Sequence, residues 1–172
     1  DLLLGWESMA GLRWSSLTRT GGHVNPPALL GALPSRGDLV LLSFDRAADP
    51  GWPVPADAMA ATLDAARRGR EVVVVDLPRR LDDAAALALD CADRTLIVVP
   101  AELRAVAAAQ RVSAMVAQHC EQRAVVVRGP SPARLRAREV ARVLSLPLAG
   151  ELEPDPEMCE GLETGHAPAA GG

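Results

Sequence analysis

Lysine and tyrosine are absent from this sequence of 172 residues, and aromatic side chains of any kind are rare. One phenylalanine and three tryptophans are present, so valine, leucine and alanine must fill the core. Such small aliphatic residues suit a β-sheet packed between alanine-rich helices better than a pocket lined by aromatic rings. The lack of lysine also excludes any site in this chain that depends on a lysine side chain.

The sequence also has few cysteines, no long apolar run and no net positive charge. The three cysteines, Cys91, Cys120 and Cys159, are odd in number and widely spaced, which predicts a reduced, cytoplasmic protein without a disulfide framework or a zinc site. No apolar run approaches the roughly 18 residues of a membrane span and no signal peptide is visible, so we expect no stable membrane insertion. A formal net charge of −4 provides no bulk attraction to nucleic acid.

Short apolar runs alternate with longer amphipathic ones along the chain. The expected strands are residues 39–44, 71–76, 95–100, 124–127 and 146–152. The expected helices are residues 29–33, 57–68, 81–91, 102–119, 131–144 and 156–164. This alternation predicts an α/β fold with a doubly wound, mainly parallel sheet, incomplete at its amino terminus. We expect a single domain over residues 1–166 and a flexible tail over residues 167–172.

The run of four valines at 72–75 is the strongest strand signal, because it is apolar on both faces like a central strand of a parallel sheet. Asp76 closes this run, and ligands of open parallel sheets bind at the carboxyl ends of the strands. An acidic residue in that position can hold a magnesium ion, often through water, beside the phosphates of a nucleotide. The alternative is that Asp76 only caps the following turn.

Two segments in this order and spacing resemble the second half of the MinD/ParA group of P-loop ATPases: Val72 to Pro78, and Ala92 to Glu102. The resemblance implies that Asp76 is the Walker B acid. Residues 124–128 are similar to the strand that carries the adenine-recognition position in that group, and residues 146–155 to a late segment whose backbone flanks the base. The implied nucleotide-binding residues are Asp76, Pro78, Arg128, Pro154 and Asp155, with Asp76 also the magnesium ligand.

Within this group, the segments Asp76 to Asp82 and Val127 to Pro130 most resemble CpaE/TadZ-like proteins, which are often described as septum-site-determining. That resemblance implies a spatial regulator that uses ATP and magnesium and dimerises when ATP is bound. Its implied partners are a second copy of itself and proteins of the septum or of pilus or secretion machinery. The implied location is the cytoplasm, with recruitment to a cell pole or septum.

The sequence departs from the MinD/ParA pattern at positions that bind the nucleotide, above all those that bind its phosphates. A Walker A loop needs clustered glycines followed by a lysine, and this sequence has no lysine. We therefore expect such a loop to precede Asp1 or never to have existed, and we expect this chain alone not to hydrolyse ATP. Arg128 also stands where many relatives have an adenine-reading asparagine. Two alternatives remain open: a non-catalytic localisation scaffold that retains the ATPase fold, and a different nucleotide-handling α/β enzyme that shares only the sheet.

Overall fold

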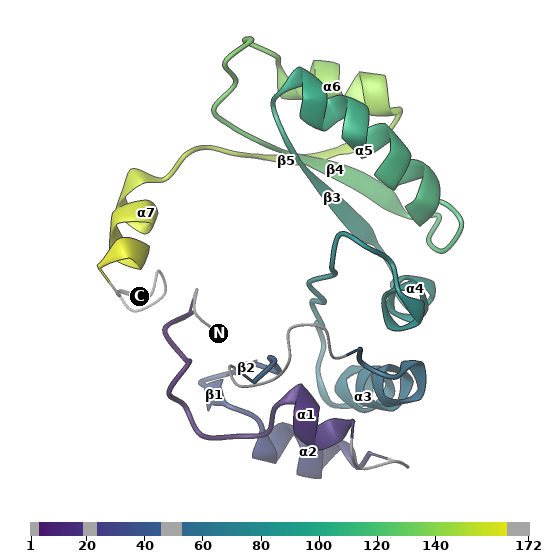
Figure 1. The fold of residues 1–172 in the computed structure, drawn as a ribbon, viewed down its shortest axis with the longest axis vertical. Coiled ribbons are helices and arrows are strands. Elements are labelled where there is room, and N and C mark those ends of the chain that lie inside the picture. Colours follow the sequence, from purple (N-terminus) through teal and green to yellow (C-terminus); the bar gives the residue numbers. More distant parts are fainter. Residues whose placement is uncertain (1–3, 19–23, 46–52, 165–172) are drawn as a thin grey trace. The chain divides into compact units, whose positions relative to one another are not determined.

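The structure is a computed structural model that describes residues 4–18, 24–45 and 53–164 (Figure 1). The chain divides into two compact units, one formed by Asp1–Ala88 with Glu157–Gly172 and the other by Leu89–Pro156. The single domain over residues 1–166 stays a prediction, and the predicted tail over residues 167–172 lies outside the described residues. No helix in the described ranges is long and apolar enough to cross a membrane.

The second unit contains a parallel sheet of three strands in the order β3-β4-β5. These strands are β3 (Thr95–Pro100), β4 (Arg123–Arg128) and β5 (Leu148–Leu152). Ile97 lies opposite Val125 and Val99 opposite Val127, and the register between β4 and β5 shifts once, at Val125/Val126. The α/β class with a parallel sheet is therefore confirmed, as are the positions of these three strands to within two residues.

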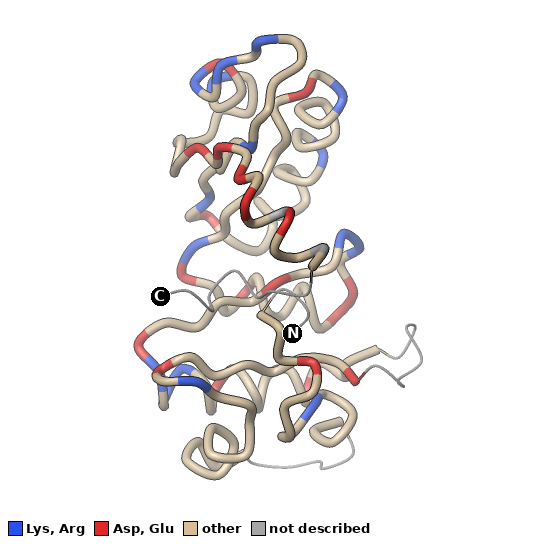
Figure 2. The backbone as a smooth tube through the Cα atoms, turned by 90° about the vertical axis from the view of Figure 1, so that its left-hand side faces the viewer, with Lys and Arg blue, Asp and Glu red and all other residues tan. Residues whose placement is uncertain are grey.

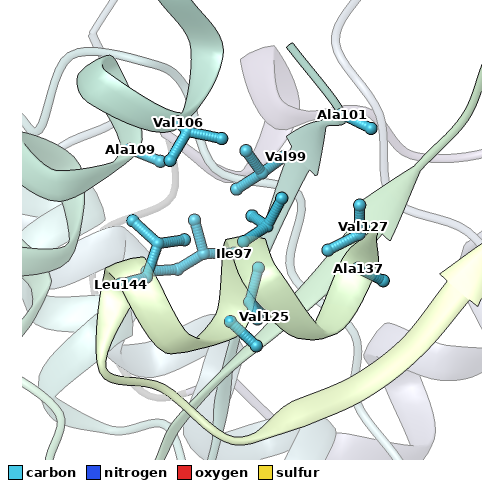
Figure 3. Packing of buried hydrophobic residues seen from close by; sticks show 11 residues of the cluster. Ile97, Val99, Ala101, Val106, Ala109, Val125, Val127, Ala137 and Leu144 are labelled. Atoms are coloured by element: carbon cyan, nitrogen blue, oxygen red, sulfur yellow. The ribbon is translucent and has the colours of Figure 1, made fainter. Parts of the chain in front are cut away.

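Helices α5 (Leu103–Val116) and α6 (Ala137–Leu144) pack on one face of this sheet (Figure 1). The side chains that point toward the helices form the main core, and they are the alternate residues of each strand. Figure 3 shows this cluster, in which Val125 has no exposed surface and Val99 and Val140 are 1% exposed. This alternation of buried and exposed residues determines which face of the sheet the helices cover.

The first unit contains helices α1 (Trp14–Leu17), α2 (Pro26–Ala32) and α3 (Ala56–Gly69) and the two-residue strands β1 (Ser35–Arg36) and β2 (Leu39–Val40). Leu17, Leu29, Leu33 and Ala65 form its buried cluster. Helix α3 ends at Gly69, one residue beyond the predicted range of 57–68. A Cβ at Gly69 would collide with the side chain of Leu30, so the glycine allows α2 and α3 to approach each other closely.

Two predicted strands are wrong. Residues 39–44 form a strand only at Leu39–Val40, which pairs antiparallel with β1. Residues 71–76 form no strand, and the side chains of Val72 and Val74 are 76% and 88% exposed. The physical reason is that a strand requires a neighbour, and the described residues place none beside 71–76. The sequence pattern therefore identified a segment suited to a sheet but not one that is paired.

The remaining helices are close to their predicted ranges, with one exception. Helix α4 covers Asp83–Asp90 and α7 covers Pro156–Glu163. Helix α6 begins at Ala137 rather than at residue 131, because Arg134 has a φ of 54° and cannot be part of a right-handed helix. Cys91 and Cys120 are free thiols, and the side chain of Cys159 is not among those described.

Ser145 ends helix α6 in the left-handed conformation, with φ 53° and ψ 39°. Its N–H bonds back to the carbonyls of Ala141 and Arg142, as is common at helix ends where glycine is preferred. We expect Ser145→Gly to raise the free energy of unfolding by about 0.5 kcal/mol, because the relief of strain exceeds the entropy gained by the unfolded chain. Urea unfolding measures this change.

Ser145→Ala is the matched control, because it removes the same hydroxyl but keeps the Cβ that causes the strain. This variant should not be more stable than the parent chain. Equal stabilisation by alanine and glycine would show that the hydroxyl, and not the backbone conformation, decides the effect.

Candidate functional site

The carboxyl ends of β3, β4 and β5 form one edge of the parallel sheet, where ligands of such folds bind. Three loops leave from this edge, at residues 101–102, 129–136 and 153–155. The backbone joins them directly: the Ala101 N–H donates to the Arg128 carbonyl at 2.9 Å, and the Gly129 N–H donates to the Leu152 carbonyl at 2.9 Å. The edge is therefore a continuous rim across all three strands.

Ser131 connects two of these loops through its side chain. Its hydroxyl donates to the carbonyl of Ala101 at 2.9 Å and accepts from the N–H of Leu135 at 2.7 Å. Ser131 is the first residue of the helix predicted over residues 131–144, but α6 begins at Ala137, so Ser131 lies in the loop before it. Its bond to the loop after β3 could not be predicted, since it depends on strand order.

We expect Ser131→Ala to lower the free energy of unfolding by about 1–2 kcal/mol, because the half-buried hydroxyl makes two hydrogen bonds that alanine cannot replace. The measurement is urea unfolding, followed by circular dichroism. Ser131→Thr retains the hydroxyl and serves as the control, with a smaller loss. Equal stability of the alanine variant and the parent chain would contradict the role of Ser131 in joining the rim.

A shallow hollow of about 220 Å³ lies beside this rim. It is lined by Glu102, Leu103, Arg104, Pro132 and Ala133, which follow β3 and β4. Its volume is below the roughly 300–1,000 Å³ usual for pockets that enclose a small ligand. None of these residues was among the predicted site residues. The hollow adds an apolar border to the rim but does not enclose a nucleotide.

The structure brings three of the predicted site residues to the same part of the rim. Arg128 is the last residue of β4 and lies opposite Leu152, two residues before Pro154. A Cβ at Gly129 would lie 3.5 Å from the Pro154 ring, so the two loops are in close contact there. The side chains of Arg128, Pro154 and Asp155 are exposed. An arginine at this position is free to stack on a planar base.

The charges around this part of the rim are of both signs. Figure 2 shows acidic residues recurring along β5 and the segment after it, where Glu151, Glu153 and Asp155 alternate with uncharged residues. Basic residues gather instead around the start of α6, at Arg134, Arg136 and Arg138. The carboxylates disfavour phosphate groups near Pro154, so this part of the rim is better suited to a neutral base than to a triphosphate.

Asp76 and Pro78 belong to the first unit, whereas Arg128, Pro154 and Asp155 belong to the second. Both Asp76 and Pro78 are exposed. The prediction that Asp76 ends a central strand is wrong, because residues 71–76 have no neighbouring strand among the described residues. Its carboxylate remains a suitable magnesium ligand chemically, since magnesium uses one or two protein carboxylates and takes its other ligands from water and phosphates.

Other candidate chemistry is limited. The Nδ1 of His119 lies 2.8 Å from the Oδ1 of Asp90, a hydrogen bond that joins the end of α4 to the residues after α5. In the part of the chain that the structure describes, no group of three or more histidine, cysteine, aspartate or glutamate residues is arranged to hold a metal. The His119–Asp90 pair is therefore best explained as a structural contact.

Comparison with protein-family models gives no match. Two uncharacterized proteins of Mycobacterium tuberculosis, from the strains CDC 1551 and H37Rv, are each 43% identical to this chain over 165 residues. The match covers 96% of this chain but 46% of each relative, so the chain spans about half the length of these curated relatives.

Among solved structures, the chain is similar to the crystal structure of a ParA family ATPase from Chlorobium tepidum TLS, with a TM-score of 0.71 and 14% sequence identity. The match covers 97% of this chain and 72% of that chain. At this identity the similarity concerns the fold. The chain therefore has an α/β, P-loop NTPase-like fold of the kind found in a ParA family ATPase.

Proposed function

We propose that this chain is part of a nucleotide-dependent spatial regulator related to the MinD/ParA proteins, and to CpaE/TadZ in particular. The observation that carries this proposal is the match of 97% of the chain to the fold of a ParA family ATPase. The motifs between Val72 and Asp155 occur in the same order and spacing as in that group, and this sequence similarity is a second line of support. The Mycobacterium tuberculosis relatives would carry out the same function.

In this proposal, the rim formed by β4 and β5 binds the adenine base. Arg128 would stack on the base, and the backbone around Pro154 and Asp155 would border its edge. The hydrogen bond from the Gly129 N–H to the Leu152 carbonyl joins the two loops at this position. The acidic residues Glu151 and Glu153 favour the neutral base over the phosphates at this position. The role of the rim is therefore recognition of the base.

The phosphates and magnesium would be held elsewhere. Asp76 would hold magnesium through water, with Pro78 in the loop beside it, and phosphoryl transfer would depend on positioning and charge stabilisation. This chain has no lysine for the terminal phosphates. We therefore propose that the phosphate-binding loop lies outside these 172 residues in the complete protein, and that the chain alone does not hydrolyse ATP.

The regulator would work as a dimer that forms when ATP is bound, and it would mark a pole or septum for pilus, secretion or division proteins. The competing function is a localisation scaffold that keeps the fold but has lost nucleotide control. Arg128 in place of an adenine-reading asparagine favours this second function. The two differ in whether ATP changes the assembly of the protein.

Sedimentation of a full-length Mycobacterium tuberculosis relative with and without magnesium and ATP distinguishes them. The regulator is expected to shift from monomer to dimer when ATP is added, and ADP serves as the control that should not cause the shift. A sedimentation coefficient that is identical in ATP, in ADP and without nucleotide would support the scaffold and contradict the regulator.

A further inference from the structure

The shallow hollow beside the rim lies between two loops that are tied to each other. One side of the hollow follows β3 and the other follows β4. The hydroxyl of Ser131, in the loop after β4, donates to the carbonyl of Ala101, after β3, at 2.9 Å. The walls of the hollow are therefore held in place before anything binds, which lowers the entropic cost of filling it. The lining residues are Glu102, Leu103, Arg104, Pro132 and Ala133.

The hollow has the size of an amino-acid side chain. Its volume is about 220 Å³, and an apolar cavity of about 150 Å³ is enough to hold a benzene ring. Leu103, Pro132 and Ala133 give the hollow an apolar surface, and Leu103 is 67% exposed. An apolar side chain that enters the hollow covers part of this exposed leucine. One large apolar side chain therefore fits here, whereas a whole nucleotide does not.

The surroundings of the hollow are basic, although the whole chain has a net charge of −4. Figure 2 shows basic residues around the start of α6, next to the wall formed by the loop after β4. Neither Arg104 nor Arg134 forms an ion pair with a carboxylate of the residues that the structure describes. Carboxylates on both sides of the apolar side chain match this charge. The exposed charged residues of segments 102–104 and 132–139 are Arg104, Arg134, Arg136, Arg138, Glu102 and Glu139.

We propose that the hollow and the arginines around it are a docking site for an acidic segment of a partner protein, which carries one large apolar side chain between carboxylates. The apolar side chain fills the hollow, and the carboxylates pair with Arg104 after β3 and Arg134 after β4. Nucleic acid is bound mainly through its phosphates and has no use for an apolar hollow. None of these residues belongs to the proposed nucleotide site, so the docking site goes beyond the proposed function.

NMR titration of the isotope-labelled chain tests the proposal with a short capped peptide in which one leucine is flanked on both sides by aspartates. The amides of Leu103 and Ala133 are expected to shift saturably, with a Kd below about 1 mM. The same peptide with glycine in place of leucine should bind at least about 10-fold more weakly, because no side chain fills the hollow. The same peptide with lysines in place of the aspartates should cause no saturable shift.

Variants of exposed residues test the two components separately, and the amide spectrum of each variant shows that it is folded. Leu103→Ser is expected to weaken binding of the aspartate peptide by about 5-fold or more, through loss of apolar contact. Arg104→Gln should weaken it by about 2- to 5-fold, the usual effect of an exposed ion pair. Arg111→Gln is the matched control, because Arg111 is exposed two turns further along α5. That is about 11 Å away, beyond the Debye length of about 8 Å at physiological salt.

Any of three results would overturn the proposal. The first is the absence of a saturable shift at Leu103 and Ala133 with the aspartate peptide. The second is equal affinity for the leucine and glycine peptides, which would show that the hollow is not used. The third is a single-stranded oligothymidylate that shifts the same amides at lower concentration than the aspartate peptide, which would identify the arginines as a surface for nucleic acid.

Discussion

Replacing Val125 with aspartate is expected to unfold the sheet unit of this protein. Val125 is in the middle strand, has no exposed surface, and lies between Ile97 of β3 and Leu148 of β5. An aspartate at this position would bury a carboxylate without a partner, at a cost of about 4 kcal/mol or more. Because a domain is usually stable by only about 5–15 kcal/mol, most of its stability would be lost. Loss of dispersion in the amide NMR spectrum measures the effect.

Val98→Asp is the matched control for this substitution. It places the same residue type in a strand of the same sheet, but on the face that helices α5 and α6 do not cover, where Val98 is 56% exposed. The carboxylate therefore stays hydrated, and the cost should be below about 1 kcal/mol. Equal destabilisation by the two variants would contradict the assignment of the buried face.

Replacing the residue that aligns with Asp76 by alanine in a full-length relative is expected to lower magnesium-dependent ATP hydrolysis by about 100-fold. In the proposed function this carboxylate holds magnesium, so its loss would remove a ligand of the ion that neutralises the charge developing on the phosphates. Steady-state phosphate release at saturating magnesium measures the change. The relative is the suitable protein, because this chain has no lysine to complete a phosphate site.

The residue of the relative that aligns with Asp64 provides a control position for this experiment. Asp64 is exposed on α3 and pairs with Arg68 one turn later, through an ion pair with a 2.6 Å N–O distance. Such a surface pair contributes little to stability, so its alanine variant should hydrolyse ATP at the parental rate. Unchanged turnover in the Asp76-equivalent variant would remove this residue from the site.

The parts of the fold that could be predicted from the sequence are those whose partners are local. Strands β3 and β4 are continuous apolar runs, so each is recognisable from its own residues. The pattern of α5 is weaker, because Val106 and Val116 are buried whereas Leu103, Val112 and Met115 are exposed. The segment 71–76 has the same apolar character, yet it is unpaired, because pairing depends on a neighbour that no local pattern specifies. A strong strand signal therefore indicates suitability for a sheet and not membership of one.

The candidate site was predictable to a similar degree. The resemblance pointed to Arg128 and Pro154, and the structure places the first at the end of β4 and the second two residues after β5. The bond from Ser131 to the loop after β3 was not predictable, since it joins residues 30 positions apart. The late start of α6 was missed because a left-handed arginine such as Arg134 is uncommon and has no local signature.

The most direct test of the account is a titration of a fluorescent ATP analogue, with magnesium, into this chain and into a full-length Mycobacterium tuberculosis relative. If the phosphates are held by residues outside this chain, the relative should bind the analogue and this chain should not. Tight binding by this chain alone would contradict the account, because it would require a phosphate site without lysine. Absence of binding by both proteins would contradict the nucleotide-dependent function itself.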